Sequence, residues 1–414
     1  MIQRPRGTRD FGPEEMEKRR WLEGVMRSTA RGFGFGEVAT PTFEHTELFA
    51  LKSGPNIVDE IYAFQDKGGR DISLRPELTA PVIRFFVNDL SNTPRPLKVF
   101  YMGPCFRYER PQSGRYREFH QFGVELIGTK TPESDAEVIG LAARIMEAIG
   151  LKEFTIRIGH IGILRKMLSD AGLDPESSAA VLQKLDKKLY EEARPMMQAV
   201  GMEDDQIGSI FDLTEVCGEV SVLDEMEGEA IDHLKGVLDV LSSYGLENVQ
   251  VDLGVVRGLD YYTGIVFEVE APSLGAEKQV CGGGSYSLSE LFGGERVFST
   301  GFAIGFDRVL LALENEGLEI KFEGLDAFVI PVKDAQRIKA FEIVSMLRRS
   351  GVRADVDLMR RSLGKNFKYA DSVGAKYAVI VGEKELDQDS VTVRDMGSGE
   401  QKLVSLQALA EFFI

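Results

Sequence analysis

Cysteine is scarce in this chain of 414 residues, and the three that occur, Cys105, Cys217 and Cys281, lie far apart. Their odd number and wide spacing argue against a disulfide framework or a zinc site, so we expect reduced thiols and, by default, the cytoplasm. No stretch approaches the roughly 18 uninterrupted apolar residues that a membrane helix requires, so we expect no membrane partner. The polar opening MIQRPRGTRDFGPEEM has no secretory signal pattern.

Basic residues are also in short supply, because 49 Lys and Arg face 66 Asp and Glu, for a formal charge of -17. A total of that sign argues against a nucleic-acid partner. The charge is unevenly placed, however: most of the acidic excess lies in residues 169–250, whereas residues 348–368 carry seven basic side chains and residues 95–117 carry six. Local fields decide where a phosphate backbone docks, so these runs are either nucleic-acid contacts or solvated faces.

The first 324 residues predict a domain rich in strands. We expect strands over residues 36–49, 71–78, 97–109, 117–129, 154–160, 248–270 and 301–306, and helices over residues 14–31, 134–149 and 307–316. Runs of strands with few intervening helices are typical of an antiparallel sheet in an α+β domain. Residues 169–247 are helical in pattern, acidic and without a strand signal, which predicts a helical insertion.

The last 89 residues, 326–414, have a different pattern. Strands are expected over residues 326–332, 352–358, 376–382 and 390–396, alternating with helices over residues 335–350 and 362–373 and followed by a closing helix. Alternation of strands and helices predicts a separate small α/β domain with a largely parallel sheet.

One stretch, CFRYERPQSGRYREFHQFGVE, combines two expected strands with a loop that contains Pro, Ser and Gly. Alternation along the second strand places Gln121, Gly123 and Glu125 on one face. An amide, a gap and a carboxylate beneath arginines such as Arg107 suit a zwitterionic ligand that carries a phosphate. A salt-bridged exposed sheet face explains the strand pattern equally well.

Two further arginines stand at unusual places. Arg257 lies between an apolar strand and Gly258, where the backbone can approach a ligand closely, and a turn with Tyr262 follows. Arg308 falls in the first turn of an expected helix, where a cation opposes the helix dipole. That locally unfavourable position indicates an anionic ligand.

These segments resemble the class II aminoacyl-tRNA synthetases, and among them the histidyl-tRNA synthetases. GFGEVATPTFEHTELF is similar to motif 1, LRPELTAP to the amino-acid-binding strand, CFRYERPQSGRYREFHQFGVE to motif 2 and GFAIGFDRVLLAL to motif 3. RGLDYYTG is similar to the peptide that distinguishes the histidine enzymes, and LGKNFKYADSVGAKYAVIVGEKE resembles the class II anticodon-binding domain. The resemblance runs in order from residue 4 to residue 310 and continues into the C-terminal domain.

The resemblance implies a ligase that converts histidine and ATP, with Mg²⁺, into histidyl-adenylate and pyrophosphate and then transfers histidine to the 3′ end of its tRNA. It implies a homodimer built on motif 1. Histidine would be bound by Glu77, Thr79, Gln121, Glu125, Tyr262 and Tyr286, with Glu125 and Tyr262 on the two imidazole nitrogens. ATP would be bound by Arg107, Arg115 and Arg308, and the catalytic arginines would be Arg107 and Arg257.

The chain departs from the family pattern after Gly284, where the family commonly reads GGRYD and this chain reads GGSYS. Ser285 and Ser287 therefore replace an arginine and an aspartate. A related non-catalytic group, the regulatory subunits of ATP phosphoribosyltransferase, resembles the catalytic domain but typically lacks the anticodon-binding domain and tolerates loss of the phosphate arginines. Residues 326–414 and the arginines at positions 107, 257 and 308 favour the ligase.

Overall fold

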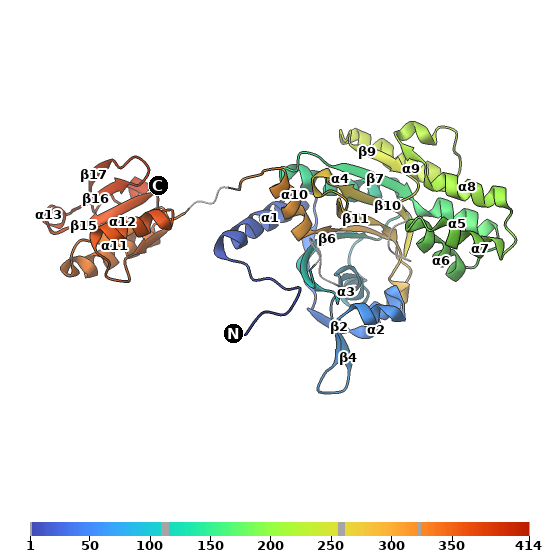
Figure 1. Ribbon diagram of the computed structural model, residues 1–414, viewed down its shortest axis with the longest axis horizontal. Helices are drawn as coiled ribbons and strands as arrows, with labels where there is room; N and C mark the ends of the chain where they lie inside the picture. The colour runs from blue at the N-terminus through green and yellow to red at the C-terminus, as the bar shows by residue number, and fades with distance from the viewer. Residues whose placement is uncertain (1, 109–115, 256–260, 321–323, 414) are drawn as a thin grey trace. The chain divides into compact units, whose positions relative to one another are not determined.

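The computed structural model describes residues 2–108, 116–255, 261–320 and 324–413. The chain forms two compact units, Met1–Glu319 and Ile320–Ile414 (Figure 1). None of the helices in the described stretches has the length and apolar character that a bilayer crossing requires.

A sheet of nine strands among the described residues organises the larger unit. Six adjacent strands, in the order β5, β6, β12, β11, β10 and β7, pair antiparallel with one another. The pairs on either side of these six, β1–β5 and β7–β9, are parallel. The predicted antiparallel α+β domain is therefore confirmed. The order across the sheet is β1 (Gly36–Glu37), β5 (Leu97–Phe106), β6 (Glu118–Ile127), β12 (Ser299–Gly305), β11 (Gln279–Tyr286), β10 (Tyr262–Glu270), β7 (Thr155–His160), β9 (Val249–Asp252) and β8 (Cys217–Gly218).

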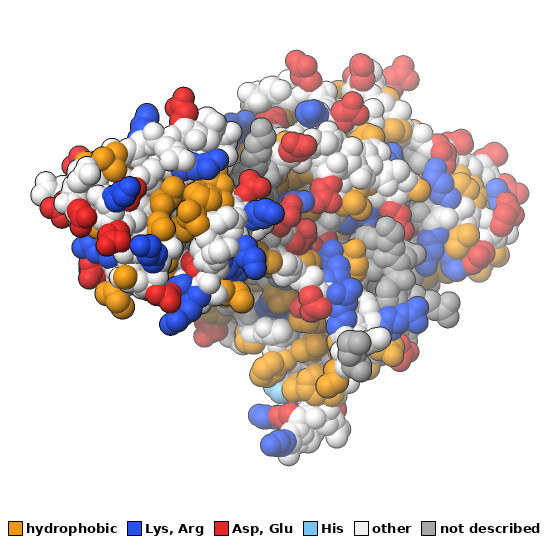
Figure 2. Space-filling model, turned by 60° about the vertical axis from the view of Figure 1, so that its left-hand side comes forward, with side chains coloured by type: hydrophobic (Ala, Val, Ile, Leu, Met, Phe, Trp, Pro, Cys, Tyr) orange, Lys and Arg blue, Asp and Glu red, His pale blue; other side chains and the backbone are white. Residues whose placement is uncertain are grey.

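A second, three-stranded sheet has the order β2 (Phe43–His45), β4 (Asp71–Leu74), β3 (Ala63–Gln65). The expectation of one strand over residues 36–49 is wrong in its second half, because helix α2 (Thr46–Ser53) follows β2 directly. Hydrophobic side chains gather above the tip of the β3–β4 hairpin (Figure 2). Helix α3 (Thr79–Phe85) begins soon after β4 and contacts α2.

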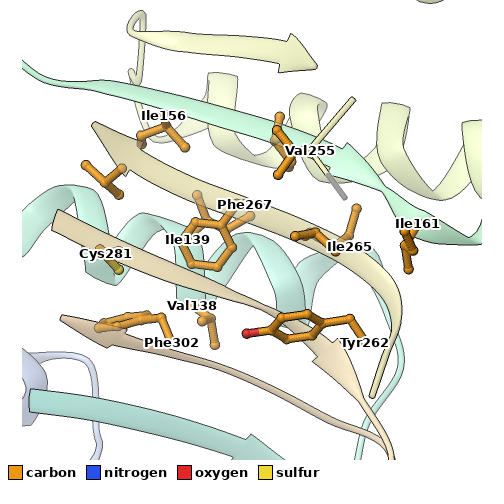
Figure 3. Packing of buried hydrophobic residues seen from close by; sticks show 14 of the residues in the cluster. Val138, Ile139, Ile156, Ile161, Val255, Tyr262, Ile265, Phe267, Cys281 and Phe302 are labelled. Atoms are coloured by element: carbon orange, nitrogen blue, oxygen red, sulfur yellow. The ribbon is translucent and has the colours of Figure 1, made fainter. Parts of the chain in front are cut away.

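Helix α4 (Pro132–Ala148) covers one face of the large sheet. Its first turn is closed by a capping box, in which Thr131 and Ser134 each bond the backbone N–H of the other. Val138 and Ile139 lie against the side chains that β10, β11 and β12 direct to this face (Figure 3). Helices α1 (Pro13–Gly32) and α9 (Glu229–Ser243) flank α4, and α10 (Phe306–Asn315) packs on β6. This layer leaves the opposite face of the sheet for a ligand.

The acidic segment is helical as expected. Four helices precede α9, namely α5 (Ile161–Asp170), α6 (Pro175–Asp186), α7 (Tyr190–Gln198) and α8 (Asp204–Thr214). The expectation that this segment lacks strands is wrong, because β8 within it pairs with β9 at the edge of the large sheet. A two-residue strand is too short to produce a pattern in the sequence.

The C-terminal unit has a five-stranded sheet with helices on both faces. Alternate residues of β13 divide its core: Ala327 and Val329 pack with α11, and Phe328 and Ile330 with α12. Only β14, β13 and β15 are parallel to one another, so the sheet is mixed. The expected closing helix is reduced to a 3-10 helix at Glu411–Phe413, because residues 401–405 form a strand, β17, that pairs with β16. The elements are β13 (Ala327–Pro331), α11 (Arg337–Arg349), β14 (Ala354–Val356), α12 (Leu363–Ser372), β15 (Tyr377–Val381), α13 (Glu383–Leu386), β16 (Ser390–Asp395) and β17 (Gln401–Ser405).

Candidate active site

A cavity of about 440 Å³ lies over β6, β10, β11 and β12, beside the start of α10. Four of the residues predicted from the sequence line it: Arg107, Gln121, Tyr262 and Arg308. The other described candidates form a group next to it that hydrogen bonds connect through Tyr101, with Glu125 and Tyr286 buried and Glu77 and Thr79 half-buried. Arg115 and Arg257 lie outside the described residues.

Glu125 is the centre of the buried group. Its carboxylate is 1% exposed and accepts hydrogen bonds from two tyrosine hydroxyls, that of Tyr101 at 2.8 Å and that of Tyr286. The Tyr101 hydroxyl also lies 3.1 Å from Oγ1 of Thr79. Burial raises the pKa of Glu125 to about 7, against the opposing effect of the two tyrosine hydrogen bonds. A buried acid of this kind can accept a proton from a ligand or donate one to it near neutral pH.

Glu77 is held at the first turn of α3. Its carboxylate accepts hydrogen bonds from the backbone N–H groups of Thr79, at 2.6 Å, and Ala80, at 3.1 Å. Lys52 of α2 lies 3.2 Å from the same carboxylate and 4.6 Å from the centre of the Tyr261 ring. The lysine side chain is only 4% exposed, so it brings a fixed positive charge next to Glu77. Lys52 was not among the predicted site residues, because it follows the expected strand over residues 36–49 and lies in no motif that marks a ligand site.

Glycines form the floor beneath these side chains. Gly123 lies opposite Tyr101 in the β5–β6 pair, and a Cβ at Gly123 would overlap the Tyr101 ring. A Cβ at Gly301 would likewise overlap the Glu125 carboxylate, and one at Gly284 would press on the Tyr262 ring. Glycine is therefore required at positions 123, 284 and 301, because large polar side chains pack directly against the backbone there.

Tyr262 joins the buried group to the cavity. It pairs with Tyr286 across β10 and β11, and the two ring centres are 6.4 Å apart. Tyr261 is also in ring contact with both, at 4.6 Å from Tyr262 and 5.4 Å from Tyr286. Burial raises the pKa of Tyr262, so the phenol stays protonated and can serve as a hydrogen-bond donor.

The two candidate arginines among the described residues, Arg107 and Arg308, both line the cavity. Arg107 directly follows β5, and its Nε donates to the Pro76 carbonyl at 3.1 Å, while its guanidinium lies 5.2 Å from the centre of the Phe119 ring. Arg308 donates to the carbonyl oxygen of Glu277 and pairs with its carboxylate at 3.1 Å. Because the Glu277 side chain is 47% exposed, an anionic ligand can take its place on Arg308.

The cysteines carry no reactive thiol in this site. Cys105 lies beside the cavity, and its thiol donates to Oε1 of Gln121 at 3.3 Å. Burial raises the pKa of Cys105 to about 12, so the thiol is protonated at neutral pH. Among the described residues, no group of three His, Cys, Asp or Glu side chains is arranged to hold a metal ion.

The two serines of GGSYS have structural partners. Ser285 donates to Oδ1 of Asp135 on α4 at 2.7 Å, and Oδ2 of Asp135 lies 2.8 Å from Nε2 of His233 on α9. Ser287 donates to the Val297 carbonyl at 3.2 Å. Ser285 thus fastens the strand that carries Tyr286 to the helices behind the sheet.

The antiparallel sheet, the arginine-lined cavity and the arrangement of the matching motifs define a class II aminoacyl-tRNA synthetase. A sequence profile described as "Histidyl-tRNA synthetase" matches residues 7–309, and one described as "Anticodon binding domain" matches residues 326–414. The chain belongs to the histidyl-tRNA synthetase family, as the resemblance predicted.

Individual relatives agree along the full length. The "Histidine--tRNA ligase" of Archaeoglobus fulgidus is 49% identical, over 99% of this chain and 98% of the relative. The crystal structure of apo S. aureus histidyl-tRNA synthetase is similar with a TM-score of 0.77 and 31% identity, with both chains fully covered. An "ATP phosphoribosyltransferase regulatory subunit/histidyl-tRNA synthetase" from Bacillus halodurans C has a TM-score of 0.78 at 26% identity, over 92% of this chain and 98% of that chain.

Proposed function

We propose that this protein is a histidine–tRNA ligase that works through histidyl-adenylate. The carboxylate of histidine attacks the α-phosphorus of ATP, the bond to the β-phosphate oxygen breaks, and pyrophosphate leaves. The 3′-terminal ribose hydroxyl of the tRNA then attacks the adenylate carbonyl, and AMP leaves. The observation that carries the proposal is the buried carboxylate of Glu125, which accepts from two tyrosine hydroxyls next to a cavity that Arg107 and Arg308 line.

The histidine half of the site reads both ends of the amino acid. The α-amino group of histidine donates hydrogen bonds to Glu77, Thr79 and Gln121. The two imidazole nitrogens form hydrogen bonds with Glu125 and Tyr262. In a neutral imidazole one ring nitrogen carries a proton and donates a hydrogen bond, and the other accepts one. A carboxylate and a phenol hydroxyl can together pair with both nitrogens. An analogue without these nitrogens leaves both groups unpaired, a penalty of about 10⁴–10⁵ in comparable sites.

The nucleotide half stabilises negative charge on the phosphates. Arg107 and Arg257 act at the α-phosphate, where charge develops as the carboxylate attacks, and Arg115 and Arg308 hold the γ-phosphate. A side-chain general base is unnecessary, because the histidine carboxylate is already ionised. Mg²⁺ accompanies ATP, and the buried carboxylate of Glu268 on the cavity wall supplies the type of oxygen ligand that Mg²⁺ prefers.

The decisive test is ATP–pyrophosphate exchange measured with each of the twenty amino acids. We expect exchange with histidine and negligible exchange with the others. Equal exchange with threonine or glycine would refute the histidine assignment. No exchange with any amino acid would refute the ligase itself.

The C-terminal unit is proposed to bind the anticodon stem. Its basic run does not lie on one helix face but extends from the end of α11 through β14 to α12, with exposed side chains at Arg349, Arg360, Lys365 and Lys368. Truncation at Gly324 should preserve histidine-dependent exchange and strongly reduce aminoacylation of tRNA. Added salt should weaken tRNA binding, by a logarithmic slope of roughly 0.9 for each phosphate contact. A truncated protein that charges tRNA as efficiently as the full chain would contradict this role.

A cytoplasmic homodimer is proposed, with motif 1 and the adjacent three-stranded sheet at the interface. Phe43, Val58 and Phe64 are 57%, 40% and 49% exposed on this sheet and its flanking turn, an apolar surface of the kind that a partner covers (Figure 2). Two-fold dimers are the commonest oligomers. Sedimentation that gives a fully active monomer of 45.9 kDa would contradict the dimer.

A further inference from the structure

The segment that precedes α1 lies against the residue that leads into β6. The backbone N–H of Arg117 donates to the Gly7 carbonyl at 2.9 Å. Gly7 has a φ of +88°, and a Cβ there would overlap the Arg117 side chain. The guanidinium of Arg117 lies 4.4 Å from the centre of the Tyr108 ring. The N-terminal segment is thus fitted closely to the end of the motif 2 stretch.

Arg9 connects Tyr116 and Asp307 at this junction, and its guanidinium carbon also lies 5.0 Å from the centre of the Phe11 ring. Its guanidinium carbon lies 3.5 Å from the centre of the Tyr116 ring, and its Nη2 donates to Oδ1 of Asp307 at 2.6 Å. Asp307 also accepts from Arg19 at 2.6 Å and from the backbone N–H of His120 at 3.2 Å. Burial alone would raise the pKa of Asp307, but the two guanidinium groups outweigh it and lower the pKa, so the carboxylate stays charged.

Tyr116 and Asp307 form a wall between two cavities. Both line the nucleotide cavity, together with Arg308, which directly follows Asp307. Both also line a second cavity of about 450 Å³ on the other side of the wall, and Arg9 belongs only to this second side. Arg9 therefore fixes two residues of the nucleotide cavity from behind and has no contact surface inside that cavity.

We propose that Arg9 is a positioning residue for ATP, which sets the Tyr116 ring and the start of α10 for the nucleotide. A flat guanidinium can lie face to face on the phenol ring and donate to Asp307 from its edge, whereas a lysine ammonium has no flat face for such stacking and makes the weaker contact. Without Arg9, Tyr116 loses its ring contact and Asp307 keeps Arg19 as its only described ion-pair partner. The inference rests on the proposed use of the cavity lined by Arg107 and Arg308 for ATP.

The test compares three variants of the full-length protein in histidine-dependent pyrophosphate exchange. Arg9→Ala should raise KM for ATP by about tenfold and leave KM for histidine unchanged, because a cation–π contact and one ion pair are lost. Arg9→Lys should fall between Arg9→Ala and the unaltered protein. The matched control is Arg4→Ala, in the same segment, since Arg4 is itself exposed and pairs with exposed Asp10 at 3.4 Å. Its two KM values should not change.

A double-mutant cycle separates positioning from a general effect on folding. Tyr116→Leu alone should also raise KM for ATP, and adding Arg9→Ala to it should have little further effect if the two residues act through their contact. Fully additive effects, or an equal rise in both KM values together with a lower melting temperature, would overturn the proposal. Failure of the unaltered protein to perform any exchange would instead overturn the proposed function, so the two failures are distinguishable.

Discussion

The two halves of the site hold their polar groups in different ways. On the side proposed to bind histidine, Glu125, Tyr101 and Tyr286 are each at most 2% exposed, and tyrosine hydroxyls donate to both carboxylate oxygens of Glu125. On the nucleotide side, Arg107 and Arg308 face a cavity, and the carboxylate that pairs with Arg308 is half exposed. One half is enclosed, with a central carboxylate that accepts from two tyrosine hydroxyls, and the other is accessible and cationic.

This difference matches what each half must do. A buried hydrogen-bond acceptor discriminates strongly between amino acids with similar side chains. An amino acid without the matching donor leaves the desolvated acceptor without a hydrogen bond, which costs binding energy. Pyrophosphate has to leave after each turnover, so its arginines have to exchange partners readily. Enclosure therefore provides selectivity, and access to solvent allows release.

The largest effect is expected from Arg257 and Arg107, the arginines proposed to act at the α-phosphate. Arg257→Ala should leave histidine binding nearly intact and reduce the rate of adenylate formation by about 10²–10³, the scale for the loss of one transition-state donor. Arg107→Ala should behave in the same way. Histidine binding is measured by equilibrium dialysis and adenylate formation by single-turnover kinetics. A variant with an unaltered activation rate would remove its arginine from the mechanism.

The enclosed half should produce a pH dependence of stability. The pKa of Glu125 is raised from 4.5 to about 7. The folded protein therefore keeps this proton to higher pH than the unfolded chain does, and rising pH between these values favours unfolding. Relative to Glu125→Gln, the free energy of unfolding should fall by up to about 3 kcal/mol between pH 4.5 and 7. Denaturant titrations of both proteins that give parallel pH profiles would contradict the raised pKa.

A smaller effect is expected when one hydroxyl is removed from Glu125. Tyr286→Phe should raise KM for histidine by about tenfold and leave KM for ATP nearly unchanged, since one hydrogen bond to a charged group is lost. Tyr244→Phe is the matched control, because the Tyr244 hydroxyl donates to Glu137 at 2.8 Å on the protein surface. Equal changes in the two KM values of Tyr286→Phe would indicate a general loss of structure and remove the distinction between the halves.

The smallest effect concerns the departure from the family pattern. Ser285→Ala should lower the free energy of unfolding by about 1 kcal/mol, because it removes one hydrogen bond to Asp135, which keeps His233. KM for histidine should change less than in Tyr286→Phe. A larger rise in KM than in Tyr286→Phe would mean that the support behind the sheet controls the pocket more than the direct hydroxyl contact.

The fold class of both units could be predicted from the sequence, because the alternation of apolar and polar residues and the placement of turn residues depend on neighbouring positions only. Periodicity along β6 placed Gln121, Gly123 and Glu125 on one face, and all three lie on the site side of the sheet. Local signals failed where tertiary packing decides: α2 follows β2 without a break, and β17 forms a hairpin with β16 where a helix was expected.

The missed site residues share a different cause. Tyr101 and Lys52 act through partners that are distant in sequence, and neither lies in a pattern that marks a ligand site. Arg9 stood in a segment that fitted the family, but its role depends on Tyr116 and Asp307, 107 and 298 positions away. Pairings across such separations are set by the fold and have no signature in a single sequence.

Gly301 limits how the pocket could be redesigned for another amino acid. Any side chain at this position would overlap the Glu125 carboxylate on the neighbouring strand. Gly301 therefore cannot be replaced by a larger residue while Glu125 is present. A smaller residue at position 125 would release the space but would leave the hydroxyls of Tyr101 and Tyr286 without their acceptor. A change of substrate therefore demands several simultaneous substitutions, and single mutations that trade histidine for another amino acid should be rare in a selection experiment.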